Sequence, residues 1–243
     1  MRTIRVHLDQ SLAEETEITL PAAAARHLTR VLRLRAGARI QVFNGDGREF
    51  PAEIVDTGTR QHCRIRLDQA ERPDVESAIE VTLVQAIGRG ERMDWCIQKS
   101  TELGVARIQP VFSERTEVRL DGQRAERRQA HWQQVAVSAA EQSGRVRIPR
   151  IDAPVSLQDI SNAPGLNLVL DPQGSHSPAD LLAPPSPSFS VVIGPEGGLS
   201  ADELRGLEQR GYKRLRLGAR ILRTETAGPA ILALLQTRFG DWS

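Results

Sequence analysis

Residues 190–227 constrain the fold of this 243-residue chain most, because they repeat one local pattern twice. An apolar run stops at the glycine-rich loop 194–198, and Ser200 with Glu203 then forms a capping box, which marks the start of a helix. A second run, which alternates basic and apolar residues, ends at Gly218 and is followed by an apolar helical pattern. The stretch therefore predicts two strand–loop–helix units in succession.

Two strands that end in glycine loops and lead into helices predict a ligand crevice at the carboxyl edge of a parallel sheet. The loop G-P-E-G-G lacks the Lys-Ser or Lys-Thr of a Walker phosphate loop, and Glu196 puts a negative charge where a dinucleotide would place its pyrophosphate. Bare backbone amides beside a carboxylate better suit a cationic or donor-rich ligand, such as adenosine linked to a sulfonium. A β-turn with a helix cap and no ligand is the alternative.

Five motifs follow one another along the chain. They are Q-K-S-T-E-L-G (98–104), S-E-R-T (113–116), A-E-Q-S-G-R (140–145), G-P-E-G-G-L-S-x-x-E (194–203) and L-G-A-R-I-L-R-T-E-T-A (217–227). In this order they resemble the SPOUT methyltransferases, and within them the family that methylates a uridine of small-subunit ribosomal RNA at ring nitrogen 3. The resemblance covers nearly the whole chain.

The chain divides into two parts with different patterns. Residues 1–70 are rich in short strands and carry an N-G-D-G hairpin signal, residues 71–78 form a polar linker, and residues 79–243 alternate strands with helices. This alternation predicts an α/β fold with a mainly parallel sheet. The resemblance implies a small N-terminal PUA-like β-barrel domain that binds RNA. It also implies a C-terminal SPOUT domain with a trefoil knot, which works as a homodimer.

An acid-free window in the N-terminal part carries five arginines, of which four recur along or just beyond a predicted helix over residues 22–32. Guanidinium groups match phosphate oxygens, so this window is a candidate RNA-binding surface. A solvated face whose charge is offset elsewhere in the fold is the alternative. The candidate RNA-binding residues here are Arg26, Arg30, Arg33 and Arg35, with Arg39 at the end of the window.

The resemblance implies S-adenosylmethionine as the cofactor, bound among three strand ends of the C-terminal domain. The third strand end is the segment L-V-L-D-P-Q-G at residues 168–174, for which a plain turn is the alternative. The residues expected to bind the cofactor are Leu170, Ile193, Gly194, Glu196, Gly198, Leu217, Gly218, Ile221, Leu222 and Thr226.

A uracil imide nitrogen is a poor nucleophile until its proton leaves, so methylation there needs a base or cations that stabilise the anion. Arg223 and Arg115 are the candidates for the cationic role, and Glu225 or Glu196 for accepting the proton or binding the cofactor amine. For Arg115 the alternative is a surface ion pair with Glu114 or Glu117. For Glu225 it is a charge that complements the helix dipole.

The motif at residues 98–104 lies on a helix predicted over residues 91–103. The resemblance implies that Thr101 and Glu102 face the target base. Lys99 precedes Glu102 by three residues, and this spacing favours an ordinary surface ion pair as the alternative.

Composition limits the remaining classes of function. The net charge is +1, so no general attraction to polyanions is expected, and Cys63 and Cys96 lack the spacing of a disulfide framework or a zinc site. No metal is expected, and no apolar run reaches the length of a membrane span, which predicts a soluble, cytoplasmic protein. The expected partner is small-subunit rRNA or the assembled subunit. A SPOUT enzyme for another rRNA or tRNA site or a ribose oxygen, and an RNA-binding ribosome assembly factor without activity, are the alternatives.

Overall fold

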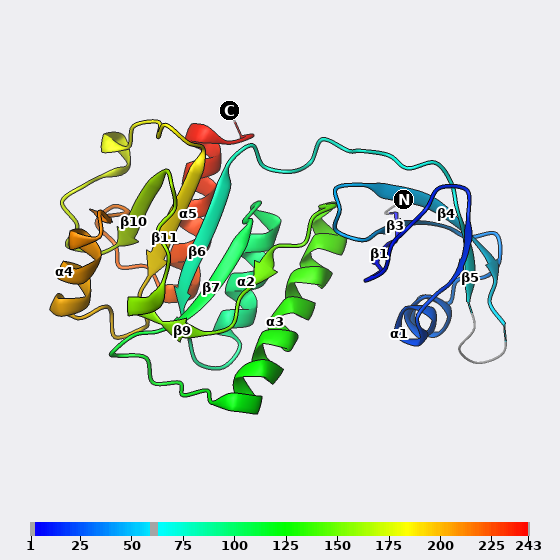
Figure 1. Cartoon of the computed structure of the whole chain (residues 1–243), viewed down its shortest axis with the longest axis horizontal. Coiled ribbons are helices and arrows are strands. Elements are labelled where there is room, and N and C mark those ends of the chain that lie inside the picture. Colours follow the sequence, from blue (N-terminus) through cyan, green and yellow to red (C-terminus); the bar gives the residue numbers. More distant parts are fainter. Residues whose placement is uncertain (1–2, 59–62, 243) are drawn as a thin grey trace. The chain divides into compact units, whose positions relative to one another are not determined.

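The computed structural model describes residues 3–58 and 63–242 (Figure 1). Two compact units divide the chain: Met1–Glu76 with Ala140–Ile148, and Ser77–Ala139 with Pro149–Ser243. The predicted linker 71–78 contains the division at residues 76 and 77. Segment 140–148 is predicted to belong to the second domain, whereas its contacts lie within the first unit. The domain limits themselves stay a prediction.

The first unit is built on a five-stranded sheet. Its strands β3 and β4 form the predicted antiparallel hairpin, in which Phe43 pairs with Glu49 around a loop where Gly45 and Gly47 adopt φ angles of +88° and +94°. The other neighbouring pairs are antiparallel too, except β1 with β3, which is parallel. The strand order is β1 (Arg5–His7), β3 (Arg39–Phe43), β4 (Glu49–Asp56), β5 (Arg64–Leu67) and β2 (Glu17–Thr19).

The helix predicted over residues 22–32 is not a single α-helix. It is α1 (Ala22–Arg26) followed by a π-helical turn at His27–Val31. The π-helical spacing is seen in the Leu32 amide, which donates to the carbonyl oxygen of His27, five residues back. In the same turn the Thr29 hydroxyl donates to the Ala25 carbonyl oxygen. Prediction from periodicity misses such a turn, because the apolar spacing changes by a single residue.

The A-E-Q-S-G-R motif (140–145) has a structural role in the first unit. Helix α3 (Gly122–Ser143) ends within this motif, and the Glu141 carboxylate accepts a hydrogen bond from the His7 amide at 2.9 Å. The carboxylate of Glu76 accepts hydrogen bonds from the backbone amides of Val146 and Arg147 and from the Arg145 guanidinium. These bonds explain why residues 140–148 join the N-terminal unit.

A parallel sheet forms the centre of the second unit, as the strand–helix alternation predicts. Every strand pair in it is parallel. The two short strands β8 and β9 carry no clear sequence signal and were not predicted. The strand order is β12 (Lys213–Leu215), β10 (Leu166–Leu170), β11 (Ser188–Ile193), β6 (Glu80–Ala86), β7 (Arg107–Phe112) and β8 (Arg150–Ile151), with β9 (Val155–Ser156) also paired to β7.

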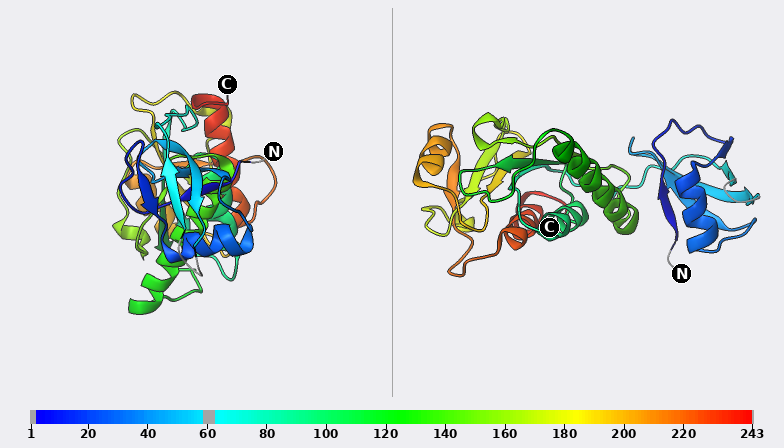
Figure 2. Two further views of the ribbon diagram at one scale, coloured as in Figure 1. Left: turned by 90° about the vertical axis from the view of Figure 1, so that its right-hand side faces the viewer. Right: turned by 90° about the horizontal axis from the view of Figure 1, so that it is seen from below.

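Helices cover both faces of this sheet (Figure 2). Helices α2 (Arg92–Glu102) and α5 (Thr224–Phe239) lie side by side on one face, and α4 (Ala201–Gln209) lies on the other. Alternation along β6 explains the division: a Cβ added at Gly228 of α5 would lie 3.1 Å from Leu83, whereas Val84 packs with Leu207 of α4. Short 3₁₀ turns at Leu157–Asp159 and Pro178–Asp180 complete the unit.

Strands β10, β11 and β12 are neighbours in the sheet and parallel, so their carboxyl ends meet at one edge. The strand predicted over residues 213–217 ends at Leu215, which leaves residues 216–223 as a loop at that edge. The trefoil knot concerns how this loop is threaded rather than how strands pair, and it stays a prediction. Within residues 3–58 and 63–242, no helix has the length and apolarity needed to cross a bilayer.

Cys96 on α2 should resist thiol reagents in the folded protein. The residue is 1 % exposed, and burial raises the pKa of its thiol to about 12. At pH 8 the group is therefore protonated and shielded, and the thiolate is the reactive form. We expect iodoacetamide labelling of Cys96 to be undetectable in native buffer and complete in denaturant, as measured by peptide mass mapping. Comparable labelling rates in the two conditions would show that α2 does not pack as described.

Candidate functional site

A cavity of about 520 Å³ lies where the loops after β10, β11 and β12 meet the first turn of α5. Nine of the ten residues predicted to bind the cofactor line it, which matches the prediction that the glycine loops share one crevice. They are Leu170, Ile193, Gly194, Glu196, Gly198, Leu217, Gly218, Ile221 and Leu222. The tenth, Thr226, does not line this cavity.

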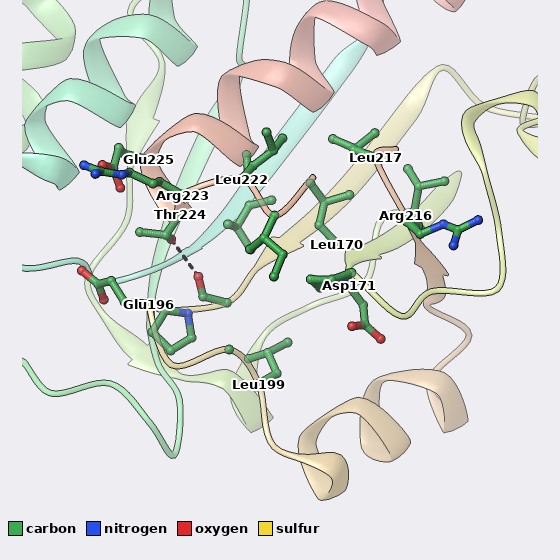
Figure 3. Close-up of a pocket in the computed structure, with 18 of the residues that line it drawn as sticks. Leu170, Asp171, Glu196, Leu199, Arg216, Leu217, Leu222, Arg223, Thr224 and Glu225 are labelled. Atoms are coloured by element: carbon green, nitrogen blue, oxygen red, sulfur yellow. Dashed lines mark hydrogen bonds between the residues drawn. The ribbon is translucent and has the colours of Figure 1, made fainter. Parts of the chain in front are cut away.

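The cavity has an apolar middle and charged ends (Figure 3). Leu170, Leu217 and Leu222 lie near its centre, Asp171 and Arg216 lie toward one end, and the charged side chains of the α5 start lie toward the other. The Asp171 carboxylate is held by the guanidinium of Arg214 at 2.7 Å. This arrangement suits an elongated ligand with an apolar ring system and polar groups at both ends.

Glycine is needed at two positions of the cavity wall for different reasons. Gly218 lines the cavity with a φ of +75°, a conformation that favours glycine, and an added Cβ would meet no atom within 4 Å. A Cβ at Gly194 would instead lie 3.1 Å from the Leu199 side chain and 3.3 Å from its amide nitrogen. A side chain at Gly194 would therefore make Leu199 shift, whereas at Gly218 the constraint is the left-handed backbone alone.

A buried hydrogen-bond chain ties the first turn of α5 to the loop after β11. The Thr224 hydroxyl donates to the Gly194 carbonyl oxygen at 2.7 Å and accepts from the Gln85 side-chain amide at 2.9 Å. Gln85 is 2 % exposed, and its oxygen accepts from the Cys96 thiol. Sequence analysis missed Gln85 and Thr224, because nothing local predicts that a β6 glutamine would reach a helix start 139 residues later.

Three charged side chains meet where the cavity reaches α2. The Arg92 guanidinium contacts the Glu196 carboxylate and lies 3.9 Å from Glu225 Oε1. Burial opposes ionisation of Glu196, but hydrogen bonds from backbone amides and from Arg92 outweigh it and lower the pKa of this carboxyl. Arg92 was also missed from the sequence, since it lies more than a hundred residues before both carboxylates.

The three residues predicted to be catalytic lie in different surroundings. Arg223 and Glu225 both line the cavity, one just before and one within the first turn of α5. Arg115 does not line it; its guanidinium donates to the Gly197 carbonyl oxygen at 2.9 Å. An ion pair with Glu117 was one alternative for Arg115, but Glu117 contacts Arg89 instead.

A second cavity, of about 680 Å³, adjoins the first on the α2 side. Thr226 lines this one, together with residues of the turn before α2 and the exposed ring of Trp95. Arg92, Arg223 and Glu225 line both cavities.

The predicted RNA-binding residues fall into two groups. Arg26, Arg30, Arg33 and Arg35 are exposed, and none of them forms an ion pair within the described part of the chain, whereas Arg39 pairs with Asp68 at 2.5 Å. These four remain candidates for binding phosphates.

The motif residues on α2 need a correction. Thr101 is fully buried, and its hydroxyl donates to the Ile97 carbonyl oxygen at 2.8 Å, so burial removes it from the candidate RNA-binding surface. Glu102 forms the ion pair with Lys99 that the three-residue spacing favours, at 2.9 Å.

Comparison of the chain with known protein families identifies the class of protein to which this fold and cavity belong. Residues 75–236 match the family model described as an RNA methyltransferase domain, and residues 20–68 match the one described as an RNA methyltransferase PUA domain. The chain is therefore an RNA methyltransferase with an N-terminal PUA domain.

Relatives that match most of the chain show to which family of RNA methyltransferases it belongs. Ribosomal RNA small subunit methyltransferase E of Buchnera aphidicola from Schizaphis graminum is 30 % identical over 100 % of this chain and 99 % of its own length, and the Mycobacterium bovis protein of the same name is 32 % identical over 89 % of this chain and 84 % of its own length. The chain belongs to the ribosomal RNA small subunit methyltransferase E family.

Two solved structures resemble the whole chain. The methyltransferase E of Neisseria gonorrhoeae, bound to S-adenosyl methionine, has a TM-score of 0.91 and 34 % identity, with 100 % of both chains covered. A Legionella pneumophila protein solved with the cofactor SAM has a TM-score of 0.93 and 36 % identity, over 99 % of this chain and 100 % of that one. The α/β methyltransferase domain and the PUA domain implied by the motifs are thereby confirmed.

Proposed function

We propose that this enzyme transfers a methyl group from S-adenosylmethionine to ring nitrogen 3 of a uridine in small-subunit (16S) ribosomal RNA. The observation that carries the proposal is the cavity at the ends of β10, β11 and β12, in a chain that resembles SAM-bound enzymes over its full length.

The cavity fits the cofactor in size and chemistry. Its volume lies within the range of about 300–1,000 Å³ for small-molecule pockets. Leu170, Leu217 and Leu222 form an apolar surface for a purine ring, and the backbone at Gly218 can form hydrogen bonds with the polar edge of that ring. Asp171 and Glu196, which are also held by Arg214 and Arg92, add carboxylate oxygens to the lining that can accept hydrogen bonds from an amine. When bound, the cofactor supplies an activated methyl group on a cationic sulfur.

The chain's own residues have to prepare the acceptor nitrogen. Arg223, which forms no ion pair among the residues described, stabilises negative charge on a uracil carbonyl as the proton leaves. The Glu225 carboxylate accepts that proton. The nitrogen then bonds to the methyl carbon, the carbon–sulfur bond breaks, and its electron pair stays on sulfur. Because Arg115 bonds to Gly197 outside the cavity, we assign it to holding the glycine loop.

The N-terminal unit and the quaternary structure complete the proposal. The exposed guanidinium groups of Arg26, Arg30, Arg33 and Arg35 bind RNA phosphates. A second copy of the chain covers the rim of the cavity, where the Ile221 side chain is 82 % exposed to solvent. Such a homodimer acts in the cytoplasm on rRNA or on the assembled small subunit.

Mass mapping of rRNA nucleosides from a deletion strain tests this function. We expect a single 3-methyluridine to disappear from small-subunit rRNA and to return when the gene is restored on a plasmid. Loss of a different methylated nucleoside, in tRNA or at a ribose oxygen, would identify another SPOUT activity. No change in any nucleoside, with a defect in subunit assembly, would identify an assembly factor without catalysis.

Replacing Gln85 with leucine should weaken cofactor binding, although Gln85 does not line the cofactor cavity. The substitution deprives the Cys96 thiol and the Thr224 hydroxyl of a buried partner, which costs about 1–3 kcal/mol of unfolding free energy. Because Thr224 also fixes the Gly194 carbonyl, we expect the Kd for S-adenosylmethionine to rise about fivefold or more, measured by calorimetry.

Gln109→Leu is the matched control for this prediction. Gln109 is a buried glutamine of the neighbouring strand β7, bonded to the Pro110 and Ala153 carbonyl oxygens and outside both cavities. It should lower stability to a similar degree and leave the Kd unchanged. Equal effects of the two variants on the Kd would show that Gln85 stabilises the fold in general and has no specific role in cofactor binding.

A further inference from the structure

The second cavity shares a wall with the first. Arg92, Arg223 and Glu225 line both, so ligands bound in the two cavities would share contacts with these side chains. A methyl-transfer enzyme must hold the methyl carbon and the acceptor atom within about 3–3.5 Å and aligned, so donor and acceptor need adjoining spaces of this kind.

An aromatic platform lies in the second cavity. Trp95 on α2 is 43 % exposed, in contrast to Trp132, which is 2 % exposed in the core. An indole ring left open to solvent at the mouth of a cavity offers a flat surface on which a nucleobase can stack, and single-stranded bases are commonly held in this way by proteins. The first cavity has no aromatic ring in its lining.

Polar groups at the shared wall match the edge of a uracil. Its two carbonyl oxygens accept hydrogen bonds, and the imide N–H between them donates one. Arg223 is free of ion pairs within the described chain and can donate to a carbonyl oxygen. The second oxygen of Glu225, Oε2, is buried and has no hydrogen-bond partner among the described residues. A buried carboxylate oxygen without a partner is unusual. The Glu225 side chain as a whole is 15 % exposed and lines the second cavity, so its carboxylate can accept a hydrogen bond from an imide N–H there.

We propose that the second cavity receives the target uracil, rotated out of the RNA and stacked on Trp95, with its imide edge toward Arg223 and Glu225. This proposal rests on the proposed function and deepens it, because it fixes where the acceptor binds. A base held inside an RNA helix has to leave the stack before a buried site can reach its ring atoms, and stacking on the indole offsets part of that cost.

Three variants test the placement: Trp95→Ala, Trp95→Phe and, as the matched control, Trp242→Ala. Trp242 is 52 % exposed and lines neither cavity. The substrate is small ribosomal subunits from a strain that lacks this enzyme, with labelled S-adenosylmethionine as methyl donor. Three quantities are measured for each variant: kcat/KM for the subunits, the Kd for S-adenosylmethionine by calorimetry, and the oligomeric state by sedimentation.

We expect Trp95→Ala to lower kcat/KM for the subunits by about 10- to 100-fold, the range typical of a lost base–aromatic stack. The phenylalanine variant should recover most of the activity, since its ring still stacks. Cofactor affinity and oligomeric state should stay within twofold of the parent, and Trp242→Ala should behave as the parent does.

Three outcomes would overturn the placement: an unchanged kcat/KM, a loss of activity that phenylalanine does not restore, or a Trp95→Ala effect that follows a change in oligomeric state. The last would make Trp95 a contact between copies of the chain. Failure of the proposed function is recognised separately, because the parent protein itself would then bind no S-adenosylmethionine or methylate no subunit RNA.

Discussion

Glu225→Gln should lower kcat for methylation by about 10²- to 10⁴-fold, the usual contribution of a general base. Glutamine keeps the shape of the side chain but cannot take a proton from the imide nitrogen. Glu225 lies in the first turn of α5 with a side chain only 15 % exposed, and its Oε1 lies 3.9 Å from the Arg92 guanidinium. Since the side chain is retained in size, the cavity should keep its shape and the Kd for S-adenosylmethionine should change less than about threefold.

Single-turnover kinetics with a saturating methyl donor measure this effect on the chemical step. Glu208→Gln is the control, because Glu208 is a carboxylate of α4 that faces Arg214 and lines neither cavity. A Glu225→Gln enzyme with a normal single-turnover rate would show that the residue serves only to complement the helix dipole. A large rise in the Kd with an unchanged rate would instead make Glu225 a cofactor ligand.

Gly218→Leu should raise the Kd for S-adenosylmethionine at least tenfold while the protein stays folded. The backbone there has a φ of +75°, and the space around a new Cβ is open, so the side chain fits without a collision and takes up free space at a residue that lines the cavity. The left-handed conformation costs a non-glycine residue about 1–2 kcal/mol, which a domain of this size tolerates. Gly194 is a less clean probe, because a side chain there would also displace Leu199.

Gly211→Leu separates the two effects. Gly211 has a φ of +87° and the same open surroundings, but it lies after α4 and outside both cavities. Calorimetry should therefore show normal cofactor binding for Gly211→Leu and weak binding for Gly218→Leu, while both lose similar stability in urea. If the two variants bound the cofactor equally well, the cavity would not be the cofactor site.

Local patterns explain how much of this site could be predicted. The capping box at Ser200 and Glu203 is present as expected, with the Ser200 amide donating to Glu203 at 2.8 Å. Each strand that ends in a glycine loop is a signal within a few residues, and parallel strands bring such loops to one edge. For this reason, nine of the ten predicted cofactor residues line one cavity.

Residues that act through distant partners could not be found in this way. Gln85, Arg92 and Thr224 join elements more than a hundred residues apart, and each looks ordinary among its sequence neighbours. Thr101 shows the opposite error: a motif residue that the resemblance placed against RNA is buried, because it lies four residues after buried Ile97 on the same face of α2. The arginines near α1 were recognised from their spacing and from the acid-free window, and only the structure shows that Arg39 is paired and the other four are exposed.

A crystal structure of this protein grown with S-adenosylmethionine tests the central claim most directly. We expect the cofactor in the cavity bounded by Gly194, Leu170 and Gly218, with its methyl group toward Arg223 and Glu225, which line both cavities. Electron density for the cofactor at any other place, or a methyl group directed away from these two residues, would contradict it.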